Sequence, residues 1–235
     1  MRKGGFPELS RVRNERDYID ELVRNILQRD IEQRFKVKHV TSFEEMSQHL
    51  LNIAPAIVVD KKLKEAFGFG SQHTAKNYVG YLKQAYLLVG LHKYSPKSLQ
   101  RLTAEKVYPI DVSLMNRRSD AFSGENLGWR LETIVYLELL RRYKSQGFDI
   151  YYFSERSGEC DFVICEGRKA VVAIQVSYDI SNEKTRKREI SGLLLAAKKT
   201  GCKNLILLTD HSYEDIEAED HRIAVRPVFD YLLNE

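Results

Sequence analysis

The 235-residue sequence predicts a two-domain α/β protein, with a helical region in residues 1–115 and an α/β sandwich in residues 120–235. Three observations support this division. The first half is dominated by segments with helical periodicity, whereas the second half alternates helical and β-prone segments in the order expected for a mixed sheet. Between the halves, residues 116–124 are polar and have no apolar period, so we expect the domain boundary there.

The N-terminal half opens with helices. In residues 14–35 apolar side chains recur at steps of three and four, which predicts one helix with a buried face. A second, shorter helix follows, for which Thr41 or Ser42 is the expected N-cap. Residues 52–60 contain a proline and are expected to form a connection.

Residues 61–111 have the element order of a winged helix. A short helix is expected over 61–67, followed by a glycine turn, Ser71 as N-cap and a helix through Tyr86. Two β-prone runs, 86–94 and 106–111, then suggest a hairpin joined by a polar loop that could touch phosphate. The second helix has a polar face that could read bases in a major groove or could be ordinary surface, made of His73, Lys76, Asn77, Lys83 and Gln84.

The C-terminal half predicts a helix, three strands, a second helix and further strands. The first helix covers 125–146, and the second begins at Asn182 and covers 182–200. A short terminal helix through Leu233 is expected to open at Pro227. The predicted strands are 149–153, 161–166, 169–176, 204–209 and 222–225.

Composition excludes several classes of function. No apolar window reaches the ~18 residues of a membrane span, so no membrane partner is expected. The three cysteines and six histidines lack zinc-site or disulfide spacing, so a reducing cytoplasm is the expected location. The net charge of +4 permits a nucleic-acid partner without requiring one. No Gly-x4-Gly-Lys-Ser/Thr loop is present, so the chain offers no basis for nucleotide hydrolysis.

Seven segments carry a resemblance to a known family: residues 4–8, 18–31, 106–111, 132–142, 159–163, 174–177 and 223–227. The second half resembles the PD-(D/E)XK nuclease-like (restriction endonuclease-like) domain, and nearly the whole chain resembles the C-terminal portion of prokaryotic AAA+-type ATPases. In that family a P-loop core precedes a winged-helix region and this domain. The resemblance implies an ATPase module as partner, with residues 4–8 as the junction. The chain would then be a C-terminal fragment or a natural protein without the motor.

At the nuclease-like positions the sequence departs from the catalytic pattern. Glu132 and Asp161 remain acidic, but Gln175 stands where a second acid is expected and Ser177 where a lysine is expected. Mg²⁺ is bound through carboxylates, and a cation stabilises the charge that develops on the phosphate, so this set predicts a degenerate site and no cofactor. Asp179 could supply a second carboxylate to a metal held by Asp161.

The sequence leaves three functions open. The leading hypothesis is a non-catalytic module that binds duplex DNA, or docks a protein partner, on behalf of an ATPase. A Mg²⁺-dependent endonuclease is the enzyme alternative, and a protein–protein interaction scaffold is the third. A basic run at the start of the second-half helix could contact phosphate, supply the missing cation or form a solvated face; it consists of Lys184, Arg186, Lys187 and Arg188.

Overall fold

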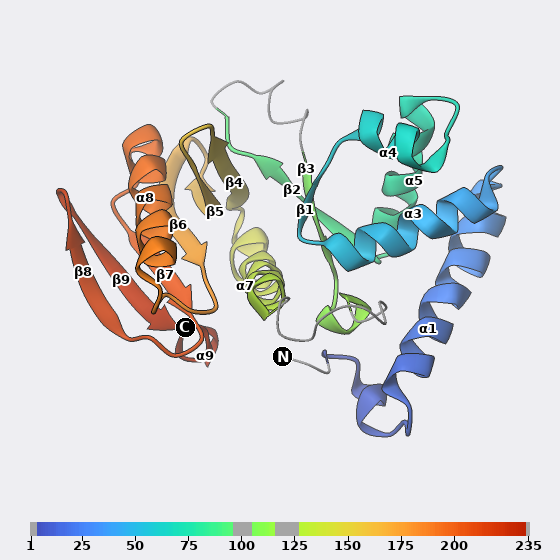
Figure 1. The fold of residues 1–235 in the computed structure, drawn as a ribbon, viewed down its shortest axis with the longest axis horizontal. Helices are drawn as coiled ribbons and strands as arrows, with labels where there is room; N and C mark the ends of the chain where they lie inside the picture. The colour runs from blue at the N-terminus through green and yellow to red at the C-terminus, as the bar shows by residue number, and fades with distance from the viewer. Residues whose placement is uncertain (1–3, 96–104, 116–126, 234–235) are drawn as a thin grey trace. The chain divides into compact units, whose positions relative to one another are not determined.

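The computed structural model describes residues 4–95, 105–115 and 127–233, which form two compact units (Figure 1). Unit 1 comprises Met1–Gly90 and Ala104–Ser123, and unit 2 comprises Leu91–Thr103 and Gly124–Glu235. Strand β2 (Leu88–Lys93) therefore begins in unit 1 and ends in unit 2. The boundary expected at residues 116–124 lies outside the described residues.

Unit 1 begins with a 3₁₀ turn (Pro7–Ser10) and a long helical segment. Helix α1 (Glu15–Asn25) continues through a π-helical stretch (Ile26–Glu32) into α2 (Gln33–Phe35), so the predicted helix over 14–35 is confirmed. Asn14 caps α1 by accepting hydrogen bonds from the backbone N–H groups of Arg16 and Asp17. The next helix, α3 (Val40–Ile53), has His39 at its N-cap position, so the expected cap at Thr41 or Ser42 was wrong; both residues already lie inside the helix.

The rest of unit 1 is a strand, two helices and two further strands. Strand β1 (Ala56–Val58) precedes α4 (Asp60–Phe67) and α5 (Gln72–Gln84), and β3 (Glu105–Pro109) leads into a 3₁₀ turn (Val112–Met115). Ser71 caps α5 as predicted, accepting from the N–H of Thr74 at 3.1 Å. Residues 52–60 were expected to be only a connection, but β1 lies within them and pairs antiparallel with β3, giving the strand order β1-β3-β2.

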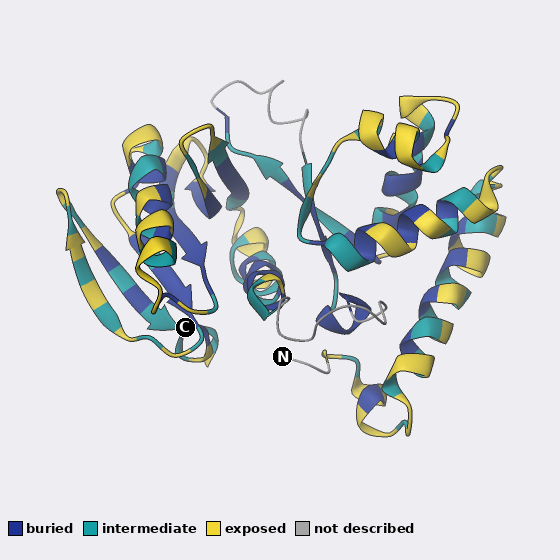
Figure 2. Ribbon diagram, viewed as in Figure 1, coloured by how far each residue is buried: buried dark blue, intermediate teal, exposed yellow. Residues whose placement is uncertain are grey.

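The core of unit 1 lies between its helices. Side chains from α1, the π-helical stretch, α3 and α5 form one buried apolar cluster, which includes Val23, Ile31, Phe43, Leu51 and Leu82. Figure 2 shows exposed residues on α4 and a largely buried or intermediate α5. The segment 96–104, which includes most of the polar loop expected to touch phosphate, lies outside the described residues.

Unit 2 is a mixed sheet with helices. Helix α7 (Leu127–Tyr143) and a 3₁₀ turn (Lys144–Gln146) lead into β4 (Asp149–Glu155), β5 (Gly158–Glu166) and β6 (Lys169–Val176). Helix α8 (Glu183–Thr200) is followed by β7 (Leu205–Thr209), β8 (Glu214–Ala218), β9 (His221–Pro227) and α9 (Val228–Leu233). The predicted order of helix, three strands, helix and strand is confirmed. Residues 125–126, where the first helix was expected to begin, lie outside the described residues.

The strands of unit 2 run in the order β2-β4-β5-β6-β7-β9-β8. The end of β2 pairs parallel with β4, the β4–β5–β6 meander is antiparallel, and β6–β7 and β7–β9 are parallel. Strand β8 was not predicted, and β9 is longer than expected. Pro227 ends β9, opposite Thr209, so the expectation that Pro227 opens the terminal helix was wrong; α9 begins at Val228.

Helices α7 and α8 cover opposite faces of this sheet. Val163 of β5 belongs to the buried cluster that contains Leu193 and Ala197 of α8, whereas its neighbour Phe162 stacks on Tyr136 of α7 with ring centroids 5.7 Å apart. Successive side chains of a strand point to opposite faces, so the two helices lie on the two sides. None of the helices in the described ranges is long and apolar enough to cross a bilayer.

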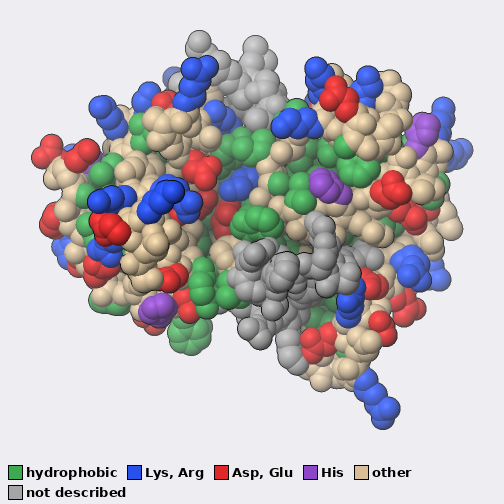
Figure 3. All heavy atoms as spheres, in the orientation of Figure 1, with side chains coloured by type: hydrophobic (Ala, Val, Ile, Leu, Met, Phe, Trp, Pro, Cys, Tyr) green, Lys and Arg blue, Asp and Glu red, His purple; other side chains and the backbone are tan. Residues whose placement is uncertain are grey.

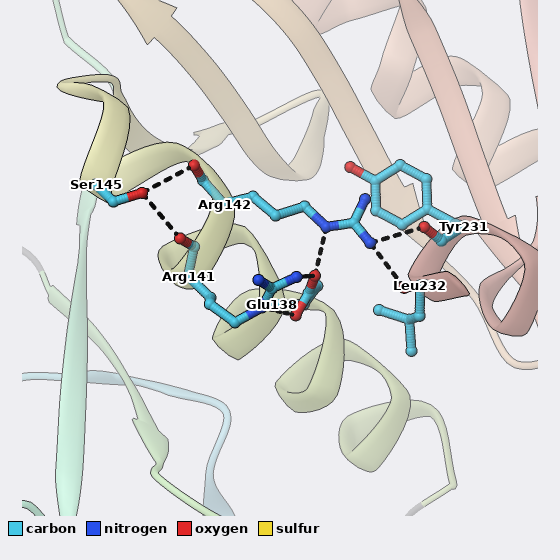
Figure 4. A network of polar contacts seen from close by, with 6 residues as sticks. All are labelled: Glu138, Arg141, Arg142, Ser145, Tyr231 and Leu232. Carbon is cyan, nitrogen blue, oxygen red and sulfur yellow. Dashed lines mark hydrogen bonds and ion pairs between the residues drawn. The ribbon is translucent and has the colours of Figure 1, made fainter. Parts of the chain in front are cut away.

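The side chain of Arg142 on α7 forms hydrogen bonds with the end of α9 (Figure 4). Its Nη2 donates to the carbonyl oxygens of Tyr231 at 3.0 Å and Leu232 at 2.8 Å, which are terminal carbonyls that a helix cannot satisfy internally. The guanidinium also lies 5.1 Å from the centroid of the Tyr231 ring. Glu138 accepts hydrogen bonds from both Arg141 and Arg142. These bonds lower the pKa of Glu138, and the bond from Arg141 has the larger effect.

Candidate functional site

A β-bulge in β5 determines where Asp161 lies. Against β4, Tyr151 faces Val163 and Phe153 faces Cys160, so three steps along β5 match two along β4. On the other side of β5, the backbone register with β6 ends at the pair Phe162 and Ile174. Bulges redirect side chains and interrupt the hydrogen-bond ladder. Asp161 therefore lies just beyond the point where β5 and β6 stop pairing.

Two polar side chains replace the missing backbone ladder. The N–H of Asp161 donates to Oε1 of Gln175 at 3.1 Å, and the N–H of Val176 donates to Oδ2 of Asp161 at 2.9 Å. Asp161 and Gln175 are only 6% and 4% exposed. Buried backbone donors need partners, and each of these side chains satisfies a backbone N–H at the point where β5 and β6 stop pairing.

Helix α8 brings a buried carboxylate onto Gln175. The amide Nε2 of Gln175 donates to Oε2 of Glu189 at 2.7 Å, and Glu189 is 4% exposed. Gly192 permits this approach, because a Cβ at that position would lie 2.1 Å from the carbonyl oxygen of Glu159. The helix backbone therefore packs directly on the start of β5, and Glu189 lies about one turn earlier on α8.

The chemistry of the two partners sets the orientation of the Gln175 amide. The N–H of Asp161 can only donate, and an ionised Glu189 can only accept. Gln175 therefore turns its oxygen to Asp161 and its nitrogen to Glu189. A carboxylate at position 175 could satisfy the first partner but not the second.

Arg188 completes the cluster at the surface. Its Nε donates to Oε1 of Glu189 at 3.1 Å, and its Nη2 bonds the same oxygen. The pKa of Arg188 is raised, first by this hydrogen bond and then by the charge of Glu189, with Glu159 and Asp161 contributing further. Sequence reasoning placed Arg188 in a basic run and missed Glu189. The available signal was its position four residues before the buried Leu193, on the apolar face of α8.

The other nuclease-like residues lie on α7 and just beyond the end of β6. Glu132 is buried on α7. The hydroxyl of Ser177 donates to the carbonyl of Asp179 at 3.2 Å. Asp179 is exposed and accepts from the N–H and the hydroxyl of Ser181, which lower its pKa. Among the residues that the structure describes, no three His, Cys, Asp or Glu side chains are arranged to hold a metal ion. Mg²⁺ belongs only to the endonuclease alternative, and the neutral amide of Gln175 stands where that alternative needs a second carboxylate.

The basic run of α8 is largely neutralised by neighbouring acids. Arg186 makes a two-pronged ion pair with Glu214 of β8, at 2.6 and 2.7 Å, and Lys187 pairs with Glu183 at 3.1 Å. With Arg188 bound to Glu189, Lys184 remains as the exposed cation for which the described residues show no ion pair. Figure 3 shows basic and acidic side chains interspersed over this part of unit 2. The run is therefore a weaker phosphate patch than its sequence suggests.

The polar face of α5 also combines exposed side chains with a lysine that is paired to an acid. His73, Lys76 and Gln84 are exposed and Asn77 is half-buried. Lys83 differs, because its Nζ donates to Oε1 of Glu105 at the start of β3, at 2.6 Å. The Glu105 carboxylate lies against Gly90 of β2, where a Cβ would come within 1.9 Å of it. One carboxylate thus ties α5, β2 and β3 together.

A further acid lies close to this face. Asp60 at the start of α4 has a raised pKa, mainly because it is partly buried, and the charges of Lys76 and Glu105 act on it in opposite directions. Lys76 is therefore partly compensated but remains exposed. Of the residues of α5 predicted to contact DNA, His73, Lys76 and Gln84 are the exposed ones.

Comparison with known proteins places the chain among longer proteins. It is 30% identical over 243 aligned residues to the uncharacterized protein MJ1544 of Methanocaldococcus jannaschii, an alignment that covers 98% of this chain and 54% of the relative. It is 32% identical over 165 residues to an uncharacterized protein of Haemophilus influenzae, covering 69% of this chain and 38% of the relative. The chain thus spans about half the length or less of these relatives. No solved structure matches it.

Two protein families divide the sequence. Residues 127–227 match a domain of unknown function, DUF4143, which is found in C-terminal regions associated with AAA-type ATPases. Residues 1–125 match another domain of unknown function, DUF8612. Because that match spans more than half of the chain, this protein belongs to the DUF8612 family.

Proposed function

We propose that this chain is a non-catalytic module that binds duplex DNA on behalf of an ATPase module. The observation that carries the proposal is the arrangement of unit 1, in which the elements α3-β1-α4-α5-β2-β3 surround a small sheet of order β1-β3-β2. This order of elements is consistent with a winged helix, in which the second helix of the helix-turn-helix would enter the major groove. Here that element is α5.

The surface of α5 suits such a contact. His73 and Lys76 are exposed on its N-terminal half, and Gln72 is exposed beside them. The N-terminal residues of a recognition helix are the ones that reach base edges. Lys, His and Gln can donate to base edges or phosphates, and duplex DNA is a dense negative charge that one-sided basic surfaces attract.

Unit 2 favours a supporting role rather than catalysis. Its order α7-β4-β5-β6-α8-β7 is consistent with a nuclease-like core, and its Asp161 occupies the bulge beside Gln175. Gln175 is held by Asp161 and Glu189 on both ends of its amide, so it has neither the charge nor the freedom of a metal-binding carboxylate. An ATPase partner is supported by the DUF4143 match and by the greater length of the relatives.

The test is fluorescence anisotropy of a labelled duplex titrated with the full chain at low and at physiological salt. We expect binding that weakens steeply with salt. Lys76→Glu should weaken binding and reduce the salt slope by about one, because one phosphate contact is lost. Lys198→Glu on the exposed face of α8 makes the same charge change in unit 2 and should have little effect. Failure of the chain to bind duplex DNA at low salt would overturn the proposal.

A protein-docking role for unit 2 is the second candidate. Phe229 and Leu233 are exposed at positions i and i+4 of α9, while Val228 and Tyr231 of the same helix are buried. The interspersed charges of α8 fit a protein surface better than a phosphate-binding one. The endonuclease alternative would require Mn²⁺- or Mg²⁺-dependent cleavage that is abolished by Asp161→Asn.

A further inference from the structure

We infer that, in unit 2, the positive charge of the Arg188 guanidinium compensates the buried carboxylate charge that a divalent metal ion would compensate in a nuclease-like catalytic site. The contacts of Arg188 stand independently of the DNA-binding proposal. The comparison with a metal site rests on the nuclease-like interpretation of unit 2. The inference assigns Arg188 as a built-in counter-cation and predicts that the native site has no need of a divalent ion.

The buried carboxylates of this cluster carry charge that has to be compensated. Asp161 and Glu189 are both more than nine-tenths buried, and Glu159 lies at the start of the same strand as Asp161. Buried carboxylates are costly unless they are paired and hydrogen-bonded. In a metal-dependent nuclease the ion performs this task, because Mg²⁺ binds through one or two carboxylates.

Arg188 contacts one of these carboxylates, that of Glu189. It bonds Glu189 directly, and the charges of Glu159 and Asp161 favour its protonated form. Guanidinium is always charged near neutral pH and presents planar donors that match a carboxylate. Gln175 joins the backbone N–H of Asp161 to the carboxylate of Glu189 through a neutral amide, so its side chain adds no negative charge between them.

The ion pair between Lys187 and Glu183 on the same helix shows how the contact between Arg188 and Glu189 differs from an ordinary surface ion pair. The side chains of Arg188 and Lys187 are both 73% exposed, and each bonds a glutamate of the same helix. The partner of Lys187 is 71% exposed, whereas the partner of Arg188 is 5% exposed. Exposed pairs contribute little, but removal of one member of a buried pair leaves a charge uncompensated.

The first experiment is a set of thermal melts of the full chain, followed through Trp129, which is the chain's single tryptophan and lies on α7 of unit 2. Arg188→Met should lower Tm by roughly 4–8 °C, whereas the matched control Lys187→Met should change it by less than about 2 °C. Arg188→Met/Glu189→Gln should recover part of the loss, because the uncompensated charge is removed. Equal effects of the two single substitutions would overturn the inference.

The second experiment uses Mn²⁺ and Mg²⁺ alone as probes. The native chain should show no change in Tm that depends on Asp161, as judged against Asp161→Asn. Gln175→Glu/Arg188→Met restores a carboxylate and removes the cation, so it should gain a Tm rise with millimolar Mn²⁺. An Asp161-dependent Mn²⁺ response in the native chain would overturn the inference. So would the absence of a response in a double variant that still unfolds cooperatively. If the double variant does not fold, the thermal comparison above decides alone.

Discussion

Gln175→Glu is the substitution that tests the candidate site most directly. It would restore the acid that the nuclease-like pattern expects, with almost no change of shape. In the native chain Nε2 of Gln175 donates to Oε2 of Glu189 at 2.7 Å, and both residues are buried. The variant replaces this bond with two carboxyl groups in contact, while the bond from the N–H of Asp161 is kept.

The expected cost is about 3 kcal/mol near pH 7.5. A hydrogen bond to a charged acceptor contributes roughly 1.5–3 kcal/mol. The like charges also raise the pKa of the variant's carboxyl pair, and a tenfold change in a protonation equilibrium corresponds to about 1.4 kcal/mol. For a protein of this size a loss of about 3 kcal/mol corresponds to a Tm lower by roughly 6–12 °C. We therefore expect a folded but clearly weakened unit 2.

The pH dependence identifies the mechanism. A raised carboxyl pKa contributes stability that is fully present below the unfolded value of about 4.3 and is lost as pH rises through the folded value. The deficit of Gln175→Glu relative to the native chain should therefore be small near pH 5 and grow towards pH 8. Denaturant titrations followed through Trp129 measure it, and Gln146→Glu, at an exposed position of unit 2, is the control. A deficit that is constant with pH, or below about 0.5 kcal/mol, would refute the carboxylate contact.

Three further substitutions test contacts outside this pair. Lys83→Glu should weaken duplex binding several-fold in anisotropy titrations. The charge swap Lys83→Glu/Glu105→Lys should restore most of the affinity. If the swap does not restore the affinity, Lys83 is a phosphate contact instead. Gly192→Ala should lower the free energy of unfolding by roughly 1–3 kcal/mol, since its Cβ would meet the carbonyl of Glu159, and an unchanged denaturation midpoint would contradict that packing. Arg142→Met should speed hydrogen exchange in α9 by about tenfold or more, because it removes two carbonyl contacts; unchanged exchange would show that apolar packing alone holds the helix.

The sequence predicted the elements whose pattern is local. The three-residue and four-residue steps of 14–35, the Ser71 cap and the apolar strand 169–176 all indicated the correct element, because each signal lies within the segment that it describes. Strand β8 was missed because Glu214-Asp-Ile-Glu-Ala218 has little β propensity and forms an edge, where charged residues are tolerated.

The candidate site was only half predictable for a different reason. Asp161 and Gln175 stand in recognisable strand positions, so their proximity could be expected. Glu189 and Arg188 come from a helix packed on the sheet, and their contacts depend on Gly192, a residue whose role is visible only when the helix and strand are brought together. The ion pair between Lys83 and Glu105 is similar, since it joins residues 22 positions apart.

The bulge explains why polar residues persist at positions that lack the catalytic pattern. Where β5 leaves β6, the N–H groups of Asp161 and Val176 bond side chains instead of the opposite strand. An apolar residue at 161 or 175 would leave one of these donors unsatisfied, at a cost of roughly 1–3 kcal/mol. A polar side chain is therefore required there whether or not a metal binds. Once Gln175 supplies the acceptor and also donates to Glu189, a second carboxylate at that position becomes unfavourable for the stability of the fold.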